Sequence, residues 1–223
     1  MTLTELIADV RSYVKRPTTV SDAKITSWIN WAQRYVARLH TFQEMHDTAL
    51  VHTVDGTINY SYPTDTKEVY DIVVENASQS QKLDFVHYTD FHLANPLPTL
   101  TTEAMPTQYS DVGNQFYVFP IPDKVYHLNL TIAKFPVRFL LATQESELVD
   151  KDDLIVLAAT MFGLILLRED ATVIKGYGEL FGTLLASAIG AEPQKPDWRP
   201  TVSKSTYPTG LSQYWLDPHV KHA

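Results

Sequence analysis

The chain of 223 residues contains no cysteine, which excludes disulfide bonds, thiolate metal sites and catalysis by a thiol. Long hydrophobic runs are also missing. The longest, at residues 154–167, is interrupted by Thr160 and Gly163, and because it is too short to span a bilayer it predicts a buried helix. Residues 1–5 lack the basic and apolar stretches of a signal peptide, so we expect a protein that is made and kept in the cytoplasm.

Positive charge is scarce and scattered along the chain. The 18 lysines and arginines are outnumbered by 26 acidic residues, which gives a net charge of −8, and the basic residues form no cluster. Binding to nucleic acid through counterion release needs clustered lysine and arginine side chains. We therefore expect no general attraction of this protein for DNA phosphates, and no membrane partner.

Two amphipathic helices are predicted at the start of the chain, at residues 2–15 and from residue 21 or 22 to about residue 45. Thr2 and Glu5 have the spacing of a capping box at the first of them. Apolar residues recur every three or four positions, as one buried stripe requires. The stripes consist of Leu3, Leu6, Ile7, Val10 and Val14 in the first helix, and of Ile25, Trp28, Ile29, Ala32, Val36 and Leu39 in the second.

The period of the apolar pattern changes to about two at residues 46–148, which predicts strands. The first strand pair is expected across a turn at Asp55 and Gly56, because a glycine after aspartate suits a tight hairpin. The predicted pairs are 48–54 with 57–62, 68–75 with 82–88, and 115–119 with 125–135. In the last strand one face is apolar and the other polar, which indicates an antiparallel sheet or a small sandwich. The apolar face consists of Tyr126, Leu128, Leu130 and Ile132.

A second helical pair is predicted at residues 151–168 and 171–189, with Asp150 as the N-cap of the first helix and Gly190 as the end of the second. The first helix is apolar nearly all round, so we expect it at the centre of a bundle. The second places two glycines at residues 176–178, which favours close helix contact. Its apolar stripe consists of Val173, Ile174, Tyr177, Leu180, Phe181, Leu184 and Ala188.

Neither helical pair can bury its apolar stripe alone, so the two pairs are expected to meet. The sequence therefore predicts an α+β fold, with a four-helix core made from the N- and C-terminal helix pairs, an inserted antiparallel β-domain and an extended C-terminal arm. The predicted boundaries are 1–45 for the first helical pair, 46–148 for the β-domain, 149–190 for the second helical pair and 191–223 for the arm.

The arm is rich in proline and in large aromatic side chains. Five of the thirteen prolines follow Gly190, and a segment with so many prolines is neither a helix nor a central strand. Large aromatic side chains on an extended segment are expected to dock, either on their own subunit or on a partner. We favour a partner, because a proline-rich segment buries little surface on its own core. The aromatic residues are Trp198, Tyr207, Tyr214 and Trp215.

Trp31 is a second candidate for a partner contact. Trp28 and Ile29 fit the buried stripe of the second helix, whereas Trp31 falls outside that stripe. A large aromatic side chain on the outer face of a helix is a candidate interface residue.

No motif predicts catalysis or a cofactor. His87 and His92, with Asp90 between them, offer metal-binding side chains, but no third ligand follows at a known spacing, and a polar cluster at the end of a strand is the favoured interpretation. A nucleophile elbow, a phosphate-binding loop and an HExxH pattern are all missing. An enzyme or ligand-binding domain that uses a cleft between helices and sheet remains the alternative from another functional class.

Three stretches resemble the head-to-tail connector, or adaptor, proteins of tailed bacteriophages. The first is LTELI at residues 3–7 followed by SDAKITSWINWAQR at residues 21–34. The second is MPTQY at residues 105–109 followed by FYVFPIPD at residues 116–123. The third is the closing helical pair that ends in an extended arm.

This resemblance implies a structural virion protein without enzymatic activity and without a cofactor. Such proteins form a ring, by the resemblance a dodecamer, in the virion neck between the portal protein and the tail or nozzle proteins, and DNA passes through the channel of the ring. The arm would reach the portal or a neighbouring subunit. Another neck or tail-completion protein of a phage is the alternative within the same class.

Overall fold

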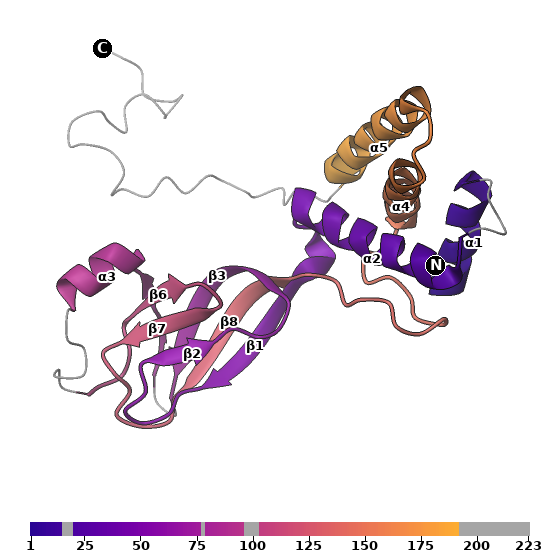
Figure 1. The fold of residues 1–223 in the computed structure, drawn as a ribbon. Helices are drawn as coiled ribbons and strands as arrows, with labels where there is room; N and C mark the ends of the chain where they lie inside the picture. The colour runs from indigo at the N-terminus through magenta and orange to yellow at the C-terminus, as the bar shows by residue number, and fades with distance from the viewer. Residues whose placement is uncertain (15–19, 77–78, 96–102, 192–223) are drawn as a thin grey trace, which may run out of the picture. The chain divides into compact units, whose positions relative to one another are not determined.

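The computed structural model describes residues 1–14, 20–76, 79–95 and 103–191, and it confirms an α+β fold (Figure 1). Residues 1–191 form one compact unit, and the residue boundaries expected inside it remain predictions. The described helices are α1 (Leu3–Val14), α2 (Asp22–Leu39), the short 3₁₀ helix η1 (Gln43–Met45), α3 (Tyr88–Ala94), α4 (Asp152–Leu166) and α5 (Ala171–Ala191). The described strands are β1 (His46–His52), β2 (Asn59–Ser61), β3 (Thr66–Glu75), β4 (Ser80–Lys82), β5 (Asp84–Phe85), β6 (Gln108–Val112), β7 (Gln115–Phe119) and β8 (His127–Lys134).

Helix α4 lies in the hydrophobic core that α1, α2 and α5 share. Nine of its fifteen residues are buried, as expected for a helix that is apolar nearly all round. Gly163 shows how closely α4 packs on α2, because a Cβ atom there would lie 2.7 Å from Cζ3 of Trp28. Because Gly163 has no side chain, the buried indole ring of Trp28 has room to pack against α4.

The ends of the helices agree only in part with the predictions. The capping box is confirmed, since the backbone N–H of Thr2 donates to Glu5 Oε2 at 2.8 Å and that of Glu5 donates to Thr2 Oγ1 at 3.4 Å. The cap at Asp150 is wrong, because Asp150 has a left-handed φ of 56° and Lys151 precedes the helix. Helix α2 ends at Leu39 and not near residue 45, and α5 continues past Gly190.

The strands form a sandwich of two four-stranded sheets, ordered β1-β8-β3-β4 and β2-β7-β6-β5. One hydrophobic core holds side chains from both sheets, including Leu130 of β8 and Phe116 of β7, which are fully buried. The predicted apolar face of β8 is confirmed, since all four of its side chains are at most 2% exposed. Every strand pair in the described residues is antiparallel except β5 with β6, which are parallel.

Two of the three predicted strand pairs are wrong. The turn at Asp55 and Gly56 exists, and Gly56 has a φ of 70°, but the strands on either side of it enter different sheets, where β1 pairs with β8 and β2 with β7. Strands β7 and β8 also belong to different sheets. The third pair is confirmed only in part. Strand β3 does pair with the segment after it, but β4 begins at Ser80, and of the predicted strand 82–88 only Lys82 lies in the ladder with β3. The chain then crosses to the second sheet at β5 and begins α3 at Tyr88.

Polar contacts join α2 to the sandwich. The ammonium group of Lys67 donates to the backbone carbonyl oxygen of Ala37 at 2.8 Å and to Thr41 Oγ1 at 2.7 Å. The guanidinium of Arg34 lies over the ring of Phe135, 4.6 Å from its centroid. None of the described helices combines the length and the apolar character that crossing a membrane would need.

Candidate interaction surfaces

Trp31 is exposed on α2, where its side chain is 55% accessible, while Trp28 on the same helix is 1% accessible. This contrast agrees with the predicted stripe. Trp31 is turned by about 60° around the helix axis from Trp28, which places it beyond the edge of the buried stripe. The role of Trp31 in a partner contact stays a prediction.

The four aromatic residues of the predicted arm, Trp198, Tyr207, Tyr214 and Trp215, lie outside the described residues. Their contact with a partner is therefore also a prediction.

Helix α5 is the least covered long helix among the described residues. Only Phe181 of its 21 residues is buried, and Val173, Leu180 and Ile189 are exposed by 48%, 48% and 38%. The stripe predicted for this helix is thus covered only in part. Its two charged residues, Lys175 and Glu179, form an ion pair at 3.7 Å. A surface helix normally carries charged side chains on its outer face. The outer face of α5 is mostly apolar, which makes it a candidate surface for binding another protein.

The glycines of α5 do not make the close contacts that the sequence favoured. A Cβ atom built at Gly176 would meet no described atom within 4 Å, and one at Gly178 would meet only the end of the Met161 side chain, at 3.9 Å. Neither glycine allows a close approach of another described helix, so the prediction is wrong within the subunit.

Residues 136–148, here called the Leu140 loop, follow β8 and are bound to two helices. Asn30 of α2 makes two hydrogen bonds to the backbone of Phe139, and Gln33 Nε2 donates to the carbonyl oxygen of Val137 at 2.8 Å. The N-terminal N–H groups of α1 also bind this loop, since that of Leu3 donates to the carbonyl oxygen of Gln144 at 2.9 Å. These bonds hold the loop backbone in place.

Two leucine side chains stand out from this fixed loop. Leu140 is 82% exposed and Leu141 is 68% exposed, whereas the neighbouring Phe139 is 2% exposed and anchors the loop in the helical core. Gln144 tightens the turn, because its Oε1 accepts from the N–H of Leu140 at 2.9 Å and its Nε2 donates to the carbonyl oxygen of Arg138 at 3.2 Å. Sequence reasoning missed both leucines, although two adjacent leucines outside any predicted helix or strand were a visible signal.

A groove of about 270 Å³ lies between α1, α4 and α5, and is here called the α1–α4–α5 groove. Its lining is mainly apolar, with carboxylates at Asp9 and Asp153. The apolar part consists of Met1, Tyr13, Val156, Leu157, Leu180 and Leu184. The sequence did not predict this groove, because its walls come from helices far apart in the chain.

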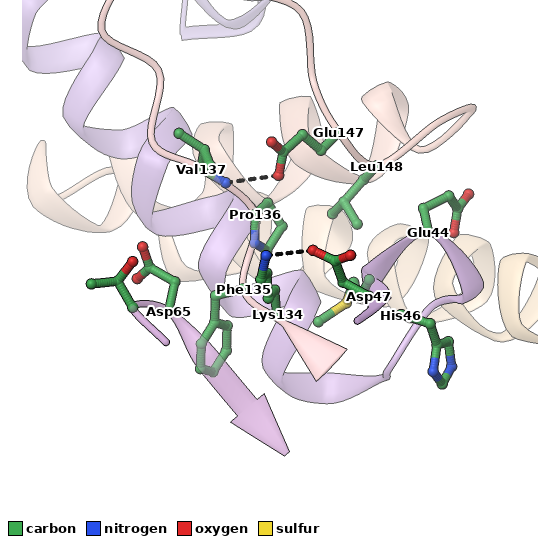
Figure 2. A pocket seen from close by; sticks show the side chains of 12 residues that line it. Glu44, His46, Asp47, Asp65, Lys134, Phe135, Pro136, Val137, Glu147 and Leu148 are labelled. Carbon is green, nitrogen blue, oxygen red and sulfur yellow. Dashed lines mark hydrogen bonds and ion pairs between the residues drawn. The ribbon is translucent and has the colours of Figure 1, made fainter. Parts of the chain in front are cut away.

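A larger and more polar pocket of about 460 Å³ lies between η1, β1, the end of β8 and the Leu140 loop (Figure 2). It tests the alternative of an active site between helices and sheet. Figure 2 shows the ammonium group of Lys134 bound to the carboxylate of Asp47, and Glu147 accepting the N–H of Val137 at 2.9 Å. The bond to Lys134 holds the pKa of the Asp47 carboxyl below its usual value.

The other carboxylates of this pocket also have partners. Glu44 Oε1 lies 2.7 Å from the ammonium group of Lys151, and Asp65 lies 3.8 Å from the guanidinium of Arg34. Within the described part of the chain, no buried polar atom without a partner belongs to a residue that lines this pocket. The charges of the pocket thus join the surrounding elements to one another, and no nucleophile is paired with a base there.

The histidine cluster has a structural role. His87 precedes α3, and its Nδ1 accepts from the N–H of Thr89 at 3.4 Å, as an N-cap does. The ring of His92 contacts that of Tyr88, with centroids 4.4 Å apart. Among the residues that the structure describes, no group of three histidine, aspartate or glutamate side chains is placed to hold a metal ion.

Buried tyrosine hydroxyls tie the sandwich together. Tyr62 donates to the carboxylate of Asp111, and burial together with this bond raises the pKa of Tyr62 far above its usual value. Tyr126 donates to Asp123 Oδ1 at 2.6 Å, and burial with that bond raises its pKa to about 12. Each hydroxyl is a satisfied buried group, because its proton is held by a neighbouring carboxylate.

The described surfaces are therefore suited to contact with other proteins and show no arranged catalytic site. A comparison with curated proteins found no match. The family model described as SU10 adaptor protein matches residues 1–205, which is most of the chain and includes every described helix and strand. The chain therefore belongs to the SU10 adaptor protein family, whose members are structural adaptor proteins of bacteriophages.

Proposed function

We propose that this protein forms a ring between the portal and the tail of the virion, through which DNA passes. Its partners are further copies of itself, in a ring of twelve, the portal protein on one side and tail or nozzle proteins on the other. The protein is made in the host cytoplasm and acts in the virion neck. It acts without a cofactor and without catalysing a reaction.

The observation that carries this proposal is the uncovered apolar surface of the helical part. Exposed leucines stand on the Leu140 loop, and α5 leaves Val173, Leu180 and Ile189 in solvent. Exposed apolar patches on a protein of a structural family mark contacts with other proteins. A ring subunit needs such surfaces on its sides, because each copy must bind two neighbours.

The negative charge of the protein suits a channel for DNA. With a net charge of −8, the ring would repel DNA phosphates weakly, so that DNA could slide through without specific binding. Tight binding to phosphates would instead slow ejection, and the chain offers no basic cluster for it.

We also propose that the aromatic residues of the arm, together with Trp31, bind the portal or a neighbouring subunit. A variant that ends at Ala191 should fold but should no longer join the portal, because Trp198, Tyr207, Tyr214 and Trp215 are removed. Co-purification with the portal measures this, and far-ultraviolet circular dichroism checks the fold. A truncated protein that joins the portal normally would show that the arm is not needed.

Electron microscopy of the purified portal complex tests the main proposal. We expect density for this protein as a closed ring in direct contact with the portal. A tail-completion protein would instead lie away from the portal, at the tail. Density of that kind, or a particle that lacks the protein, would contradict the proposal.

A further inference from the structure

We propose that the Leu140 loop of one copy inserts Leu140 and Leu141 into the α1–α4–α5 groove of a second copy. This inference rests on the proposed ring, because a ring of identical subunits is built by a contact between two different surfaces of the same chain. The loop and the groove supply two such surfaces, and the contact they would form is head-to-tail.

The loop is a pre-organised projection. Its backbone is held by Asn30 and Gln33 of α2 and by the first turn of α1, while the side chains of Leu140 and Leu141 are free of the core. A projection that is already ordered loses little conformational entropy when it binds. Most of the free energy gained by burying the two leucines can therefore stabilise the contact.

The groove is a matching cavity. Its walls carry Val156 and Leu157 of α4 and Leu180 and Leu184 of α5, so a leucine side chain that enters it meets apolar atoms on two sides. Leu180 is 48% exposed in the single chain, and burial of this side chain would add to the stability of the contact.

Charge complementarity favours a second copy of this chain as the occupant. Arg138 stands beside the leucines on the loop and is exposed, while Asp9 and Asp153 are exposed at the groove. Within the described residues neither Arg138 nor Asp9 takes part in an ion pair. When the leucines enter the groove of the next copy, the guanidinium of Arg138 would reach these carboxylates.

The two surfaces lie on opposite sides of α2, as a repeating contact requires. Trp28 packs on Gly163 of α4, whereas Asn30 and Gln33 bind the loop. At about 100° per residue, Asn30 and Gln33 lie roughly 140–200° around the helix from Trp28. Figure 1 agrees, since the loop after β8 lies on the side of α2 away from α5. A copy can therefore bind one neighbour with its loop and another with its groove.

A charge exchange in the full-length protein tests the contact. Arg138→Glu and Asp9→Lys should each lower the yield of rings on the purified portal by roughly tenfold, and the double variant should restore most of the yield. The melting temperature of each free variant should match that of the wild type, because both side chains are exposed. A double variant that assembles no better than the single variants would overturn the contact.

Cross-linking gives a second and independent readout, because the chain has no cysteine of its own that could react. In portal-bound rings, the variant with both Leu141→Cys and Leu180→Cys should give a ladder of covalent oligomers with a short thiol cross-linker. The matched control combines Leu141→Cys with Leu50→Cys, since Leu50 is 52% exposed on β1 but lies outside the groove. The control should remain monomeric.

The outcomes separate the contact from the ring. Rings that form normally, but give no ladder from Leu141→Cys with Leu180→Cys, would overturn this contact and leave the ring intact. A wild-type protein that forms no ring on the portal would instead contradict the proposed function, and the contact with it.

Discussion

The two hydrophobic cores of this protein are closed in different ways. In the sandwich, two sheets cover one core from both sides, and buried hydroxyls such as that of Tyr62 have carboxylate partners. In the helical part, α4 is buried, but its neighbour α5 has one buried residue among 21. The core of the sandwich is covered by two sheets, whereas the helical part has one long helix that is covered on one side only and that another chain can cover.

The contrast within the helical part is sharper still. Helices α4 and α5 are neighbours in the sequence and both are rich in apolar and small residues, yet only α4 is enclosed. Composition therefore does not decide which helix is buried. This difference is what the proposed assembly through α5 would require, and four experiments can break or sharpen this comparison.

The largest effect on stability is expected when a side chain is truncated in the core of the sandwich, and a much smaller one when a side chain is truncated on α5. Phe116→Ala removes a ring that is 0% exposed and should lower the free energy of unfolding by about 3–5 kcal/mol. Leu180→Ala on α5 should cost less than about 1 kcal/mol, because its side chain is half exposed. Urea unfolding followed by circular dichroism measures both values. Similar losses for the two variants would show that α5 is buried in the free protein.

Two glycine substitutions should have effects of opposite sign. Gly163→Ala should destabilise the protein by about 1–3 kcal/mol, because the new Cβ atom meets the buried ring of Trp28. Gly176→Ala should stabilise it by about 0.5–1 kcal/mol, since alanine loses less backbone freedom than glycine on folding and no described atom lies within 4 Å. Thermal unfolding of the two variants measures whether each substitution lowers or raises the stability. A loss at Gly176 in the free protein would contradict an open outer face on α5.

A smaller effect is expected at alkaline pH from a tyrosine of the sandwich. The folded pKa of Tyr62 is raised above 10, so its contribution to stability is full below pH 10 and is lost as the pH rises further. Tyr62→Phe should therefore flatten the fall in stability above pH 10. Urea midpoints at a series of alkaline pH values measure this fall. Equal slopes for the variant and the wild type would show that Tyr62 ionises alike in the folded and unfolded chain.

The sequence was sufficient to predict the four long helices and the buried face of β8, but it missed the short helix α3. The α2 stripe is confirmed except at its end, since Trp28 is buried and Trp31 is exposed as predicted, whereas Leu39 is 45% exposed. The alternation along β8 is confirmed as well. Both features depend on local periodicity, which a single chain displays directly. The capping box at Thr2 is local in the same sense.

Features that depend on distant partners could not be predicted. A period of two tells which face of β1 turns toward the core, but not that its neighbour is β8, about eighty positions further along the chain. The stripe of α5 likewise predicted an apolar face without showing whether the same chain covers it. The groove depends on helices from both ends of the chain, so the sequence did not show it. The adjacent leucines at 140 and 141 were visible in the sequence, but not that the folded loop holds them exposed.

The accessibility of α5 in the assembled particle tests the central claim most directly. A cysteine placed by Val173→Cys would be the only thiol of the chain, and its labelling by a maleimide can be timed in the free protein and in portal-bound rings. The control is Ala159→Cys in α4, where the residue is 0% exposed and labelling should be slow in both states. We predict fast labelling at position 173 in the free protein and protection in the ring. Equal labelling in both states would contradict the claim that assembly covers α5.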